Sequence, residues 1–234
     1  MARGPKQRPN PHLGQWAPCS GQTIATHTFD TAGQLTVEGT SRHFEWDQAG
    51  RLKVYRTQVT GSEPSIYAIY LYDSAGQRLK KWVRRQGGSR IDTTVYIGGI
   101  YERHERVDSG VTTVNNTLHI IDGAQRIGTE RVGPAFPEDS SPAIQYHLAE
   151  PHGTSNLVVD GSGSWCNREE YSPFGESVFG GFARKRYRYT GQERDEESGL
   201  GYHSARYYAS WLCRWTRPDP AGLVDGGNLY GYVG

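Results

Sequence analysis

The sequence predicts an all-β protein made of stacked β-hairpins. Three observations favour this fold class: the 234 residues include 30 Gly and 15 Tyr, only 35% of them are hydrophobic, and an Asp-x-x-Gly motif recurs along the chain. Few aliphatic residues beside many Tyr and Gly are typical of short strands and turns rather than packed helices. A chain of this length can bury a sizeable core in one or two domains.

The net charge and the hydropathy of the chain argue against several classes of function. The net charge is +1, so no strong field points to nucleic acid or to an anionic membrane. No apolar run approaches the roughly 20 residues that span a bilayer. Residues 1–22 are rich in Pro, Gly and basic residues and lack an apolar stretch. We therefore expect a flexible leader and no classical signal peptide.

The cysteines form no recognisable site motif. Cys19, Cys166 and Cys213 fit neither a zinc nor a thioredoxin spacing, and we expect isolated thiols. The acidic run at 193–197 lacks the spacing of a calcium-binding loop. The sequence therefore predicts no metal site and no cofactor.

The recurring motif is an aromatic or aliphatic residue, Asp, two small or polar residues, Gly and, soon after, an aliphatic residue. Three clear copies place the Asp and the Gly at Asp30 and Gly33, at Asp47 and Gly50, and at Asp73 and Gly76. Weaker copies lie at Asp122 and at Asp160. A constant turn at irregular spacing indicates stacked hairpins that carry insertions.

The motif has the chemistry of a hairpin turn. The Asp side chain caps the turn, and Gly supplies the positive φ angle that the turn needs. The flanking segments alternate and are β-prone: HFEW and RLKVYRTQV enclose the turn at Asp47, while IYAIYLY and QRLKKWVRR enclose the turn at Asp73. Residues 133–143 hold three prolines and are predicted to be a loop inserted between hairpins.

These turns and the last third of the chain resemble the YD-repeat proteins of the bacterial Rhs family and the C subunits of insecticidal Tc toxins. WDQAGRL and YDSAGQRL carry the repeat likeness, residues 146–156 stand in place of the family's DHLGS stretch, and YSPFG at 171–175 matches a further step. YTGQERD at 189–195 and ARYY, with Arg206 and Tyr207, match the Rhs-associated core. The resemblance divides the chain into repeats at 23–165 and the core at 166–234.

The resemblance implies a fold and a function. YD repeats form a long β-sheet that spirals into a hollow shell around a variable toxin, and the associated core closes one end. That core resembles an aspartic autoprotease whose two carboxylates come from two Asp-Pro-x-Gly motifs. The first motif is present as Asp219, Pro220 and Gly222, but no second motif follows the step at 228–233. We therefore expect an incomplete core.

One carboxylate is not enough for an aspartic protease, because two close carboxylates must share one proton. Asp225 lies in an Asp-Gly-Gly turn and is a weak substitute for the second carboxylate. Ser204 and Cys213 replace glycines of the family pattern, and Leu-Gly-Tyr at 200–202 replaces Leu-Tyr-Tyr. If the two former glycine positions need a positive φ, each substitution costs on the order of 1 kcal/mol.

Two further groups carry weaker hypotheses. His147, His152 and Ser155 include a nucleophile and two bases, but no nucleophile elbow surrounds the serine, so we expect polar turn and strand packing. The basic and aromatic run at 184–189 is a kind of patch that nucleic acid binds. Because the acidic run at 193–197 follows closely, we expect the two runs to pair within the chain.

Three functions stay open. The first is a non-catalytic shell piece that encapsulates or scaffolds a toxin, with the rest of the shell or a toxin-bearing polypeptide as its partner. Open sheet edges also favour self-association. The second is a half-site of the autoprotease, completed by an Asp from outside this chain.

The third is a carbohydrate- or receptor-binding module, which the density of Tyr and Trp suggests. We nevertheless expect the aromatic rings of the core to pack within a sheet, namely those of Tyr207, Tyr208, Trp211 and Trp215. The family resemblance implies delivery by a bacterial secretion system after a cytoplasmic stage.

Overall fold

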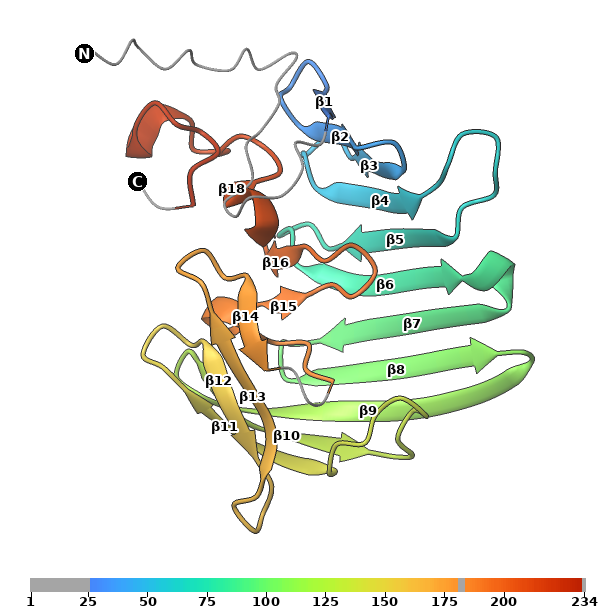
Figure 1. The fold of residues 1–234 in the computed structure, drawn as a ribbon, viewed down its shortest axis with the longest axis vertical. Coiled ribbons are helices and arrows are strands. Elements are labelled where there is room, and N and C mark those ends of the chain that lie inside the picture. Colours follow the sequence, from blue (N-terminus) through green and yellow to red (C-terminus); the bar gives the residue numbers. More distant parts are fainter. Residues whose placement is uncertain (1–25, 181–183, 233–234) are drawn as a thin grey trace.

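The computed structural model describes residues 26–180 and 184–232, apart from the side chain of Asp225, so the predicted leader at 1–22 lies outside it. The described residues fold into two antiparallel sheets joined by turns and short 3-10 helices (Figure 1). The all-β prediction is confirmed, and the larger sheet is the long sheet that the repeats predict.

Within the described residues, the large sheet is a meander of 14 strands, each antiparallel to the next strand in the chain. Its strands are β1 (His27–Phe29), β2 (Leu35–Glu38), β3 (Arg42–Trp46), β4 (Leu52–Thr57), β5 (Ile66–Tyr72), β6 (Arg78–Arg85), β7 (Arg90–Ile97), β8 (Tyr101–Asp108), β9 (Val111–Asp122), β10 (Gln125–Val132), β11 (Ile144–Ala149), β12 (Ser155–Val159), β13 (Trp165–Tyr171) and β14 (Ser177–Gly180). The predicted loop at 133–143 is confirmed between β10 and β11.

Residues 184–232, here called the core segment, carry the second sheet. Its strands are β15 (Glu193–Arg194), β16 (Gly201–His203), β17 (Arg206–Ala209) and β18 (Arg214–Trp215). The 3-10 helices are η1 (Gln86–Gly88) in the large sheet, and η2 (Tyr189–Gly191), η3 (Ser210–Leu212) and η4 (Leu223–Asp225) in the core segment.

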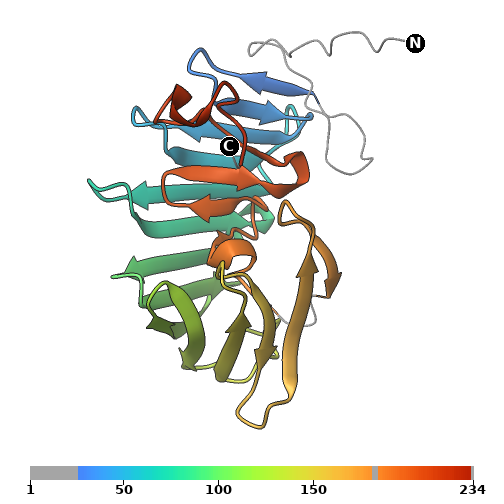
Figure 2. The ribbon, with the colours of Figure 1, turned by 90° about the vertical axis from the view of Figure 1, so that its left-hand side faces the viewer.

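The large sheet curves, and the core segment lies against one of its faces (Figures 1 and 2). We call this the inner face and the opposite one the outer face. Backbone hydrogen bonds join the core segment to both ends of the sheet, from Leu35 N–H to the Thr216 carbonyl (2.9 Å) and from Ser155 N–H to the Arg188 carbonyl (3.4 Å). Because side chains alternate along a strand, every second residue of the sheet faces the core segment.

The predicted turn chemistry is confirmed. Oδ1 of Asp30 accepts hydrogen bonds from the second and fourth N–H groups after it, at 2.9 and 2.8 Å. Asp47 and Asp160 accept the same two bonds, and Asp73 accepts the second of them. The turn glycines have positive φ angles: Gly33 (79°), Gly50 (73°), Gly76 (84°) and Gly163 (82°). At Asp122 the glycine comes directly after the Asp, and a two-residue turn forms instead.

The apolar core lies mainly between strands β2–β6 and the core segment. Its buried members are Leu35, Phe44, Leu52, Tyr55, Ala68, Tyr70 and Val83 from the sheet, and Leu200, Tyr207, Ala209 and Leu212 from the core segment. Removing this apolar surface from water is the main favourable term that holds the two parts together here.

Two predictions at single residues have different outcomes. The condition set for the former glycine positions is met, since Ser204 has a φ of 55° and Cys213 a φ of 54°. The prediction of isolated thiols is wrong for Cys213, which is disulfide-bonded. Cys166 is a free thiol, and Cys19 lies outside the described residues. A disulfide depends on the approach of two backbones in the fold, which the spacing of cysteines along the chain does not report.

In the part of the chain that the structure describes, no helix has the length and apolarity to cross a membrane. The same residues contain no group of three or more His, Cys, Asp or Glu side chains that could hold a metal ion.

Candidate functional site

The centre of the junction between sheet and core segment is a buried cluster of ion pairs. Arg78 on β6 donates from Nη1 to Asp195 Oδ2 (2.7 Å) and from Nη2 to Glu193 Oε2 (2.6 Å). Lys81, on the same face of β6, lies 2.7 Å from Asp195 Oδ1 and 3.2 Å from Glu193 Oε1. All four side chains are buried. A third carboxylate of the core segment, that of the buried Glu197, lies 3.5 Å from Lys81 Nζ. Two cations of the sheet therefore meet three carboxylates of the core segment.

The pKa values of these groups show that pairing outweighs burial. Burial alone would raise the pKa of Glu193, but the charges of Lys81 and Arg78 hold it at about 2. Burial would lower the pKa of Lys81, yet Asp195 and Glu193 raise it. The charged forms are thus stable at this junction only while sheet and core segment stay together.

A second buried cluster is centred on Glu102 of β8, whose carboxylate forms hydrogen bonds and ion pairs with both parts. Arg186 and Tyr187 of the core segment donate to it. On the sheet, His104 Nε2 lies 3.1 Å and His119 Nε2 3.0 Å from its oxygens. Burial raises the pKa of Glu102, but Arg186 and the hydrogen bonds of the histidines bring it well below its ordinary value.

The same arrangement recurs at the two ends of the sheet. Near the C-terminal end, Glu169 on β13 lies 2.8 Å from Lys185 Nζ and 3.0 Å from Arg188 Nη1. Near the N-terminal end, Glu38 on β2 accepts a hydrogen bond of 2.6 Å from the indole N–H of Trp211. Buried glutamates of the sheet therefore hold the core segment along its length.

These contacts confirm the prediction for the basic run at 184–189. Arg184 pairs with Glu196 (2.7 Å) and Arg186 with Glu193 (3.4 Å), both in the acidic run. Sequence reasoning missed Arg78, Lys81 and Glu102. The one signal in the sequence was that these charged residues stand in strands whose other residues alternate between apolar and polar. That signal does not say which residue each of them pairs with.

Arg206 and Tyr207, neighbours on β17, face opposite ways. Tyr207 is buried against the sheet, where its hydroxyl lies 2.9 Å from that of Tyr72 and accepts a hydrogen bond of 3.1 Å from Arg78. Arg206 faces Asp219, with 2.8 Å between Nη1 and Oδ2, and its guanidinium lies 4.1 Å from the ring centre of Trp215. The structure thus brings together Arg206 and Asp219, which the core signature singled out.

Asp219 also caps a turn of the same kind as the repeat turns. Its Oδ1 accepts a hydrogen bond from Ala221 N–H (2.8 Å), and its carbonyl accepts one from Gly222 N–H (3.0 Å). Gly222 has a φ of 73°, and Pro220 is exposed. The side chain of Asp225 lies outside the described residues, so its role as a second carboxylate stays a prediction.

All three clear repeat turns contact the core segment, the turn at Gly76 through the Tyr202 hydroxyl (3.4 Å) and the other two through the stretch around Asp219. The Tyr230 hydroxyl donates to the Gly33 carbonyl (2.7 Å), and Arg217 donates to the carbonyls of the turn at Gly50. A Cβ atom at either glycine would collide with these side chains, whereas a Cβ at Gly76 would meet nothing within 4 Å. The repeat turns at 30–34 and 47–51 therefore form a seat for the stretch that carries Asp219.

The structure brings His147 and Ser155 together but not His152. His147 Nδ1 lies 3.2 Å from Ser155 Oγ, and its other ring nitrogen lies 3.3 Å from the Thr129 hydroxyl rather than from a carboxylate. His152 is exposed in a turn. Burial, then the charges of Arg126 and Lys185, lower the pKa of His147 to about 4. This arrangement agrees with the expected polar strand packing and lacks the third group of a triad.

The aromatic rings of the core pack as predicted. Tyr207, Tyr208 and Trp215 are buried, and Trp211 packs against the apolar core. The ring centres of Tyr208 and Tyr232 are 4.4 Å apart. These rings are therefore contacts within the protein.

Comparison with curated proteins finds several toxins. Toxin subunit YenC1 of Yersinia entomophaga is 30% identical over 220 residues, 88% of this chain and 22% of that protein. Toxin protein Tse5 of Pseudomonas aeruginosa is 49% identical over 259 aligned residues, 94% of this chain and 19% of that protein. The probable deoxyribonuclease RhsB of Dickeya dadantii is 27% identical, over 86% of this chain and 15% of that protein. The chain thus spans between 15% and 22% of these relatives.

Comparison with solved structures also finds toxin complexes. The crystal structure of TcdB2-TccC3 matches with a TM-score of 0.77 and 28% identity, over 87% of this chain and 10% of that chain. TcdB2-TccC3 without its hypervariable C-terminal region matches with a TM-score of 0.72 and 23% identity, over 96% of this chain and 14% of that chain, a likeness of fold alone. A comparison with protein-family models finds no match.

Proposed function

Because this chain is an Rhs/YD-repeat region similar to Tc-toxin C subunits, we propose that it is a non-catalytic part of a toxin shell. In this role the curved sheet is the wall, and the core segment seals it from the inner side. The observation that carries the proposal is the junction itself, where Arg78 and Lys81 of the wall are buried against Glu193 and Asp195 of the seal. The rest of the shell, or a toxin-bearing polypeptide, is the partner.

A protease-protection experiment tests this role. The chain is expressed together with the polypeptide encoded beside it, and the purified complex is digested. We expect the neighbouring polypeptide to survive in the complex and to be degraded when it is alone. Lys81→Met weakens the seal and reduces protection, while Lys80→Met, a change of the adjacent lysine on the outer face, leaves it intact. Equal digestion with and without the chain contradicts the proposal.

Open sheet edges support a second part of the proposal, which is self-association when the partner is absent. β1 and β14 are the edge strands of the large sheet as far as the structure describes it, and unpaired edges attract further strands. Size-exclusion chromatography with light scattering measures this, and a monodisperse monomer at high concentration contradicts it. We also propose export by a bacterial secretion system after a cytoplasmic stage, which fractionation of producing cells tests.

A second candidate function is half of an autoprotease site. The contact that favours it is the 2.8 Å pair of Arg206 and Asp219, which holds the carboxylate of the core signature in place. Mass spectrometry after mixing with the neighbouring polypeptide detects cleavage. Asp219→Asn abolishes cleavage if this candidate is right, and Asp160→Asn, which changes another turn-capping aspartate, does not. Cleavage that survives Asp219→Asn removes the candidate.

The carbohydrate-binding alternative loses its main argument, because the aromatic rings of the core that motivated it are packed within the protein. A glycan array measures carbohydrate binding directly. Binding to a defined sugar would revive the alternative.

A further inference from the structure

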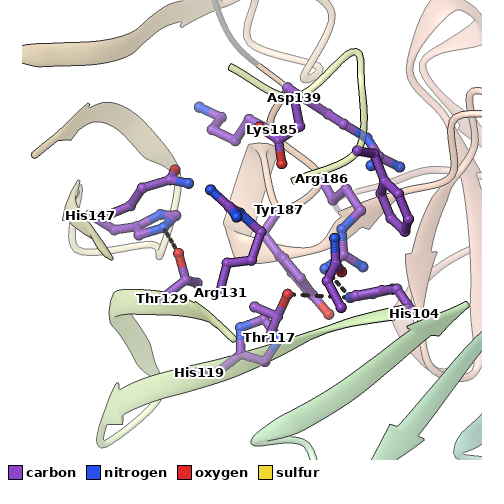
Figure 3. Close-up of a pocket in the computed structure, with 14 residues that line it drawn as sticks. His104, Thr117, His119, Thr129, Arg131, Asp139, His147, Lys185, Arg186 and Tyr187 are labelled. Carbon is purple, nitrogen blue, oxygen red and sulfur yellow. Dashed lines mark hydrogen bonds between the residues drawn. The ribbon is translucent and has the colours of Figure 1, made fainter. Parts of the chain in front are cut away.

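A small polar cavity lies beside the junction, between the inner face of strands β8–β11, the loop at 133–143 and residues 184–187 (Figure 3). Its volume is about 80 Å³, enough for several waters or one small ion. The cations that line it are Arg131, Arg184, Lys185 and Arg186, and the one lining carboxylate is Asp139. Neither the proposed seal nor the Asp219 corner uses this cavity.

Three of the four lining cations are neutralised by carboxylates of the protein. Arg184 pairs with Glu196, Lys185 with Glu169, and Arg186 with Glu102 and Glu193. Positive charge on these three side chains is therefore already balanced and does not by itself call for a ligand.

Arg131 differs from them. Its Nη1 and Nη2 donate to the carbonyls of Gly133 (3.0 Å) and Ser141 (3.0 Å), and no carboxylate of the described residues lies within ion-pair distance. Its Nε is buried and has no hydrogen-bond partner in the structure. A buried donor without a partner costs about 1–3 kcal/mol, and more on a charged group. The guanidinium therefore has both a charge and a donor to offer.

Arg126, on the same strand but outside the lining of the cavity, is a second guanidinium without an ion pair among the described residues. It donates to His119 Nδ1 (3.0 Å), its guanidinium lies 3.4 Å from the ring centre of Tyr187, and it forms no ion pair with a described carboxylate. Against these two guanidiniums stands Asp139, whose Oδ1 accepts the Ser141 N–H (3.0 Å). The immediate surroundings of the cavity, with Arg126 included, therefore carry more positive than negative charge.

We propose that this cavity binds a small oxyanion of the phosphate or sulfate class, with Arg131 as its main ligand. A guanidinium presents donors in a planar fork that matches the oxygens of such an anion. The bound anion would balance the charges of Arg131 and Arg126. His147 lines the same cavity, and its pKa is lowered first by burial and then by the charges of Arg126 and Lys185. This ligand site is independent of the shell function.

Thermal unfolding in inorganic phosphate or sulfate, against chloride at equal ionic strength, tests the site. We expect a saturable rise in Tm that reaches roughly 3–6 °C at tenfold excess over Kd. Arg131→Met removes the rise. Arg103→Met, on the outer face of β8 and paired with Glu105, retains it. The proposal is overturned if phosphate and sulfate act no more strongly than chloride, or if Arg131→Met responds like the wild type.

Titration of His147 by NMR tests whether an anion binds in the cavity, and it does so even if Arg131→Met does not fold. Phosphate raises the pKa of His147 in the wild-type chain if the anion lies in the cavity, and leaves it unchanged if it does not. Phosphoserine serves as a third probe. Binding of phosphate without binding of phosphoserine identifies a free ion as the ligand, and binding of both shows that the site also takes a phosphate carried by a larger molecule.

Discussion

Strands β2–β5 meet the core segment mainly with apolar side chains, the buried Glu38 being the exception, whereas strands β8–β13 meet it mainly with charged groups and histidines. In the first region Leu35, Phe44 and Leu52 are buried against the core segment. In the second, Glu102, His147 and Glu169 occupy equivalent inward positions. One continuous sheet with one turn chemistry therefore holds its seal by two different kinds of interaction.

This difference predicts how the stability of each region responds to pH and salt. Apolar contacts are non-directional, and no proton or salt ion competes for them. Buried charges tolerate burial only while each has its partner, because their desolvation is expensive. The first region should thus resist changes of pH, and the second should respond to them. β6, where Arg78 and Lys81 meet Glu193 and Asp195, lies at the border.

The largest effect is expected at this border. Arg78→Met leaves Glu193 and Asp195 buried with Lys81 as the remaining cation that the sheet offers them, and should lower the free energy of unfolding by about 3–5 kcal/mol. Arg84→Met, on the outer face of the same strand and paired with the exposed Glu63, should cost at most about 1 kcal/mol. Urea unfolding at pH 7 measures both. Equal losses in the two variants would show that the buried cluster does not hold the junction.

The apolar region is tested by Leu52→Ala. Leu52 has no exposed surface, and deleting its buried methyl groups should lower the free energy of unfolding by about 2–5 kcal/mol. The loss should be the same at pH 7 and at pH 5, because no titrating group is removed. Urea unfolding at the two pH values checks this, and a pH-dependent loss would contradict the separation of the two regions.

The polar region is tested by pH. The pKa of His147 is about 4 in the folded chain, below its ordinary 6.5, so the unfolded chain binds this proton more readily. Stability from His147 is therefore full above about pH 6.5 and is lost as the pH falls toward 4, by up to about 3 kcal/mol. Burial gives His203 a pKa of about 4 as well, so the wild type should show the sum of both losses.

Urea unfolding between pH 7 and pH 4.5 measures this loss. His147→Gln should reduce the slope, and His152→Gln, an exposed control, should not. Glu193, with a pKa of about 2, loses its contribution only below its ordinary value of 4.5, so it does not add to the loss measured between pH 7 and pH 4.5. If the free energy of unfolding of His147→Gln falls with pH as steeply as that of the wild type, the acid sensitivity comes from other groups.

The smallest effect concerns the seat of the Asp219 stretch. Gly76→Ala should cost about 1 kcal/mol, because alanine is strained at a φ of 84° but its Cβ would meet no atom within 4 Å. Gly50→Ala has the same strain and also displaces Arg217, so its cost should be larger. Thermal unfolding gives the difference, and NMR shifts of residues 217–222 should move only in Gly50→Ala. Equal costs would mean that the seat does not support this stretch.

Much of the fold could be predicted because its causes are local. An Asp that caps the N–H groups two and four residues later, and a Gly with positive φ between them, act within five residues. By contrast, the sequence raised a positive φ at Ser204 and Cys213 only as a condition, and the structure shows it. The loop at 133–143 follows from its prolines.

The sequence by itself thus determined the hairpins, their turns and the family likeness of the core. Only the tertiary structure decided which inward side chains meet. Arg78 and Asp195 are 117 residues apart, and their contact depends on the registers and curvature of the strands that lie between them. The same holds for the disulfide at Cys213, for the two repeat turns that seat the Asp219 stretch, and for the cavity at Arg131. The interactions that form a turn act over a few residues. Which side chains meet across the sheet depends on the register of every strand pair that lies between them.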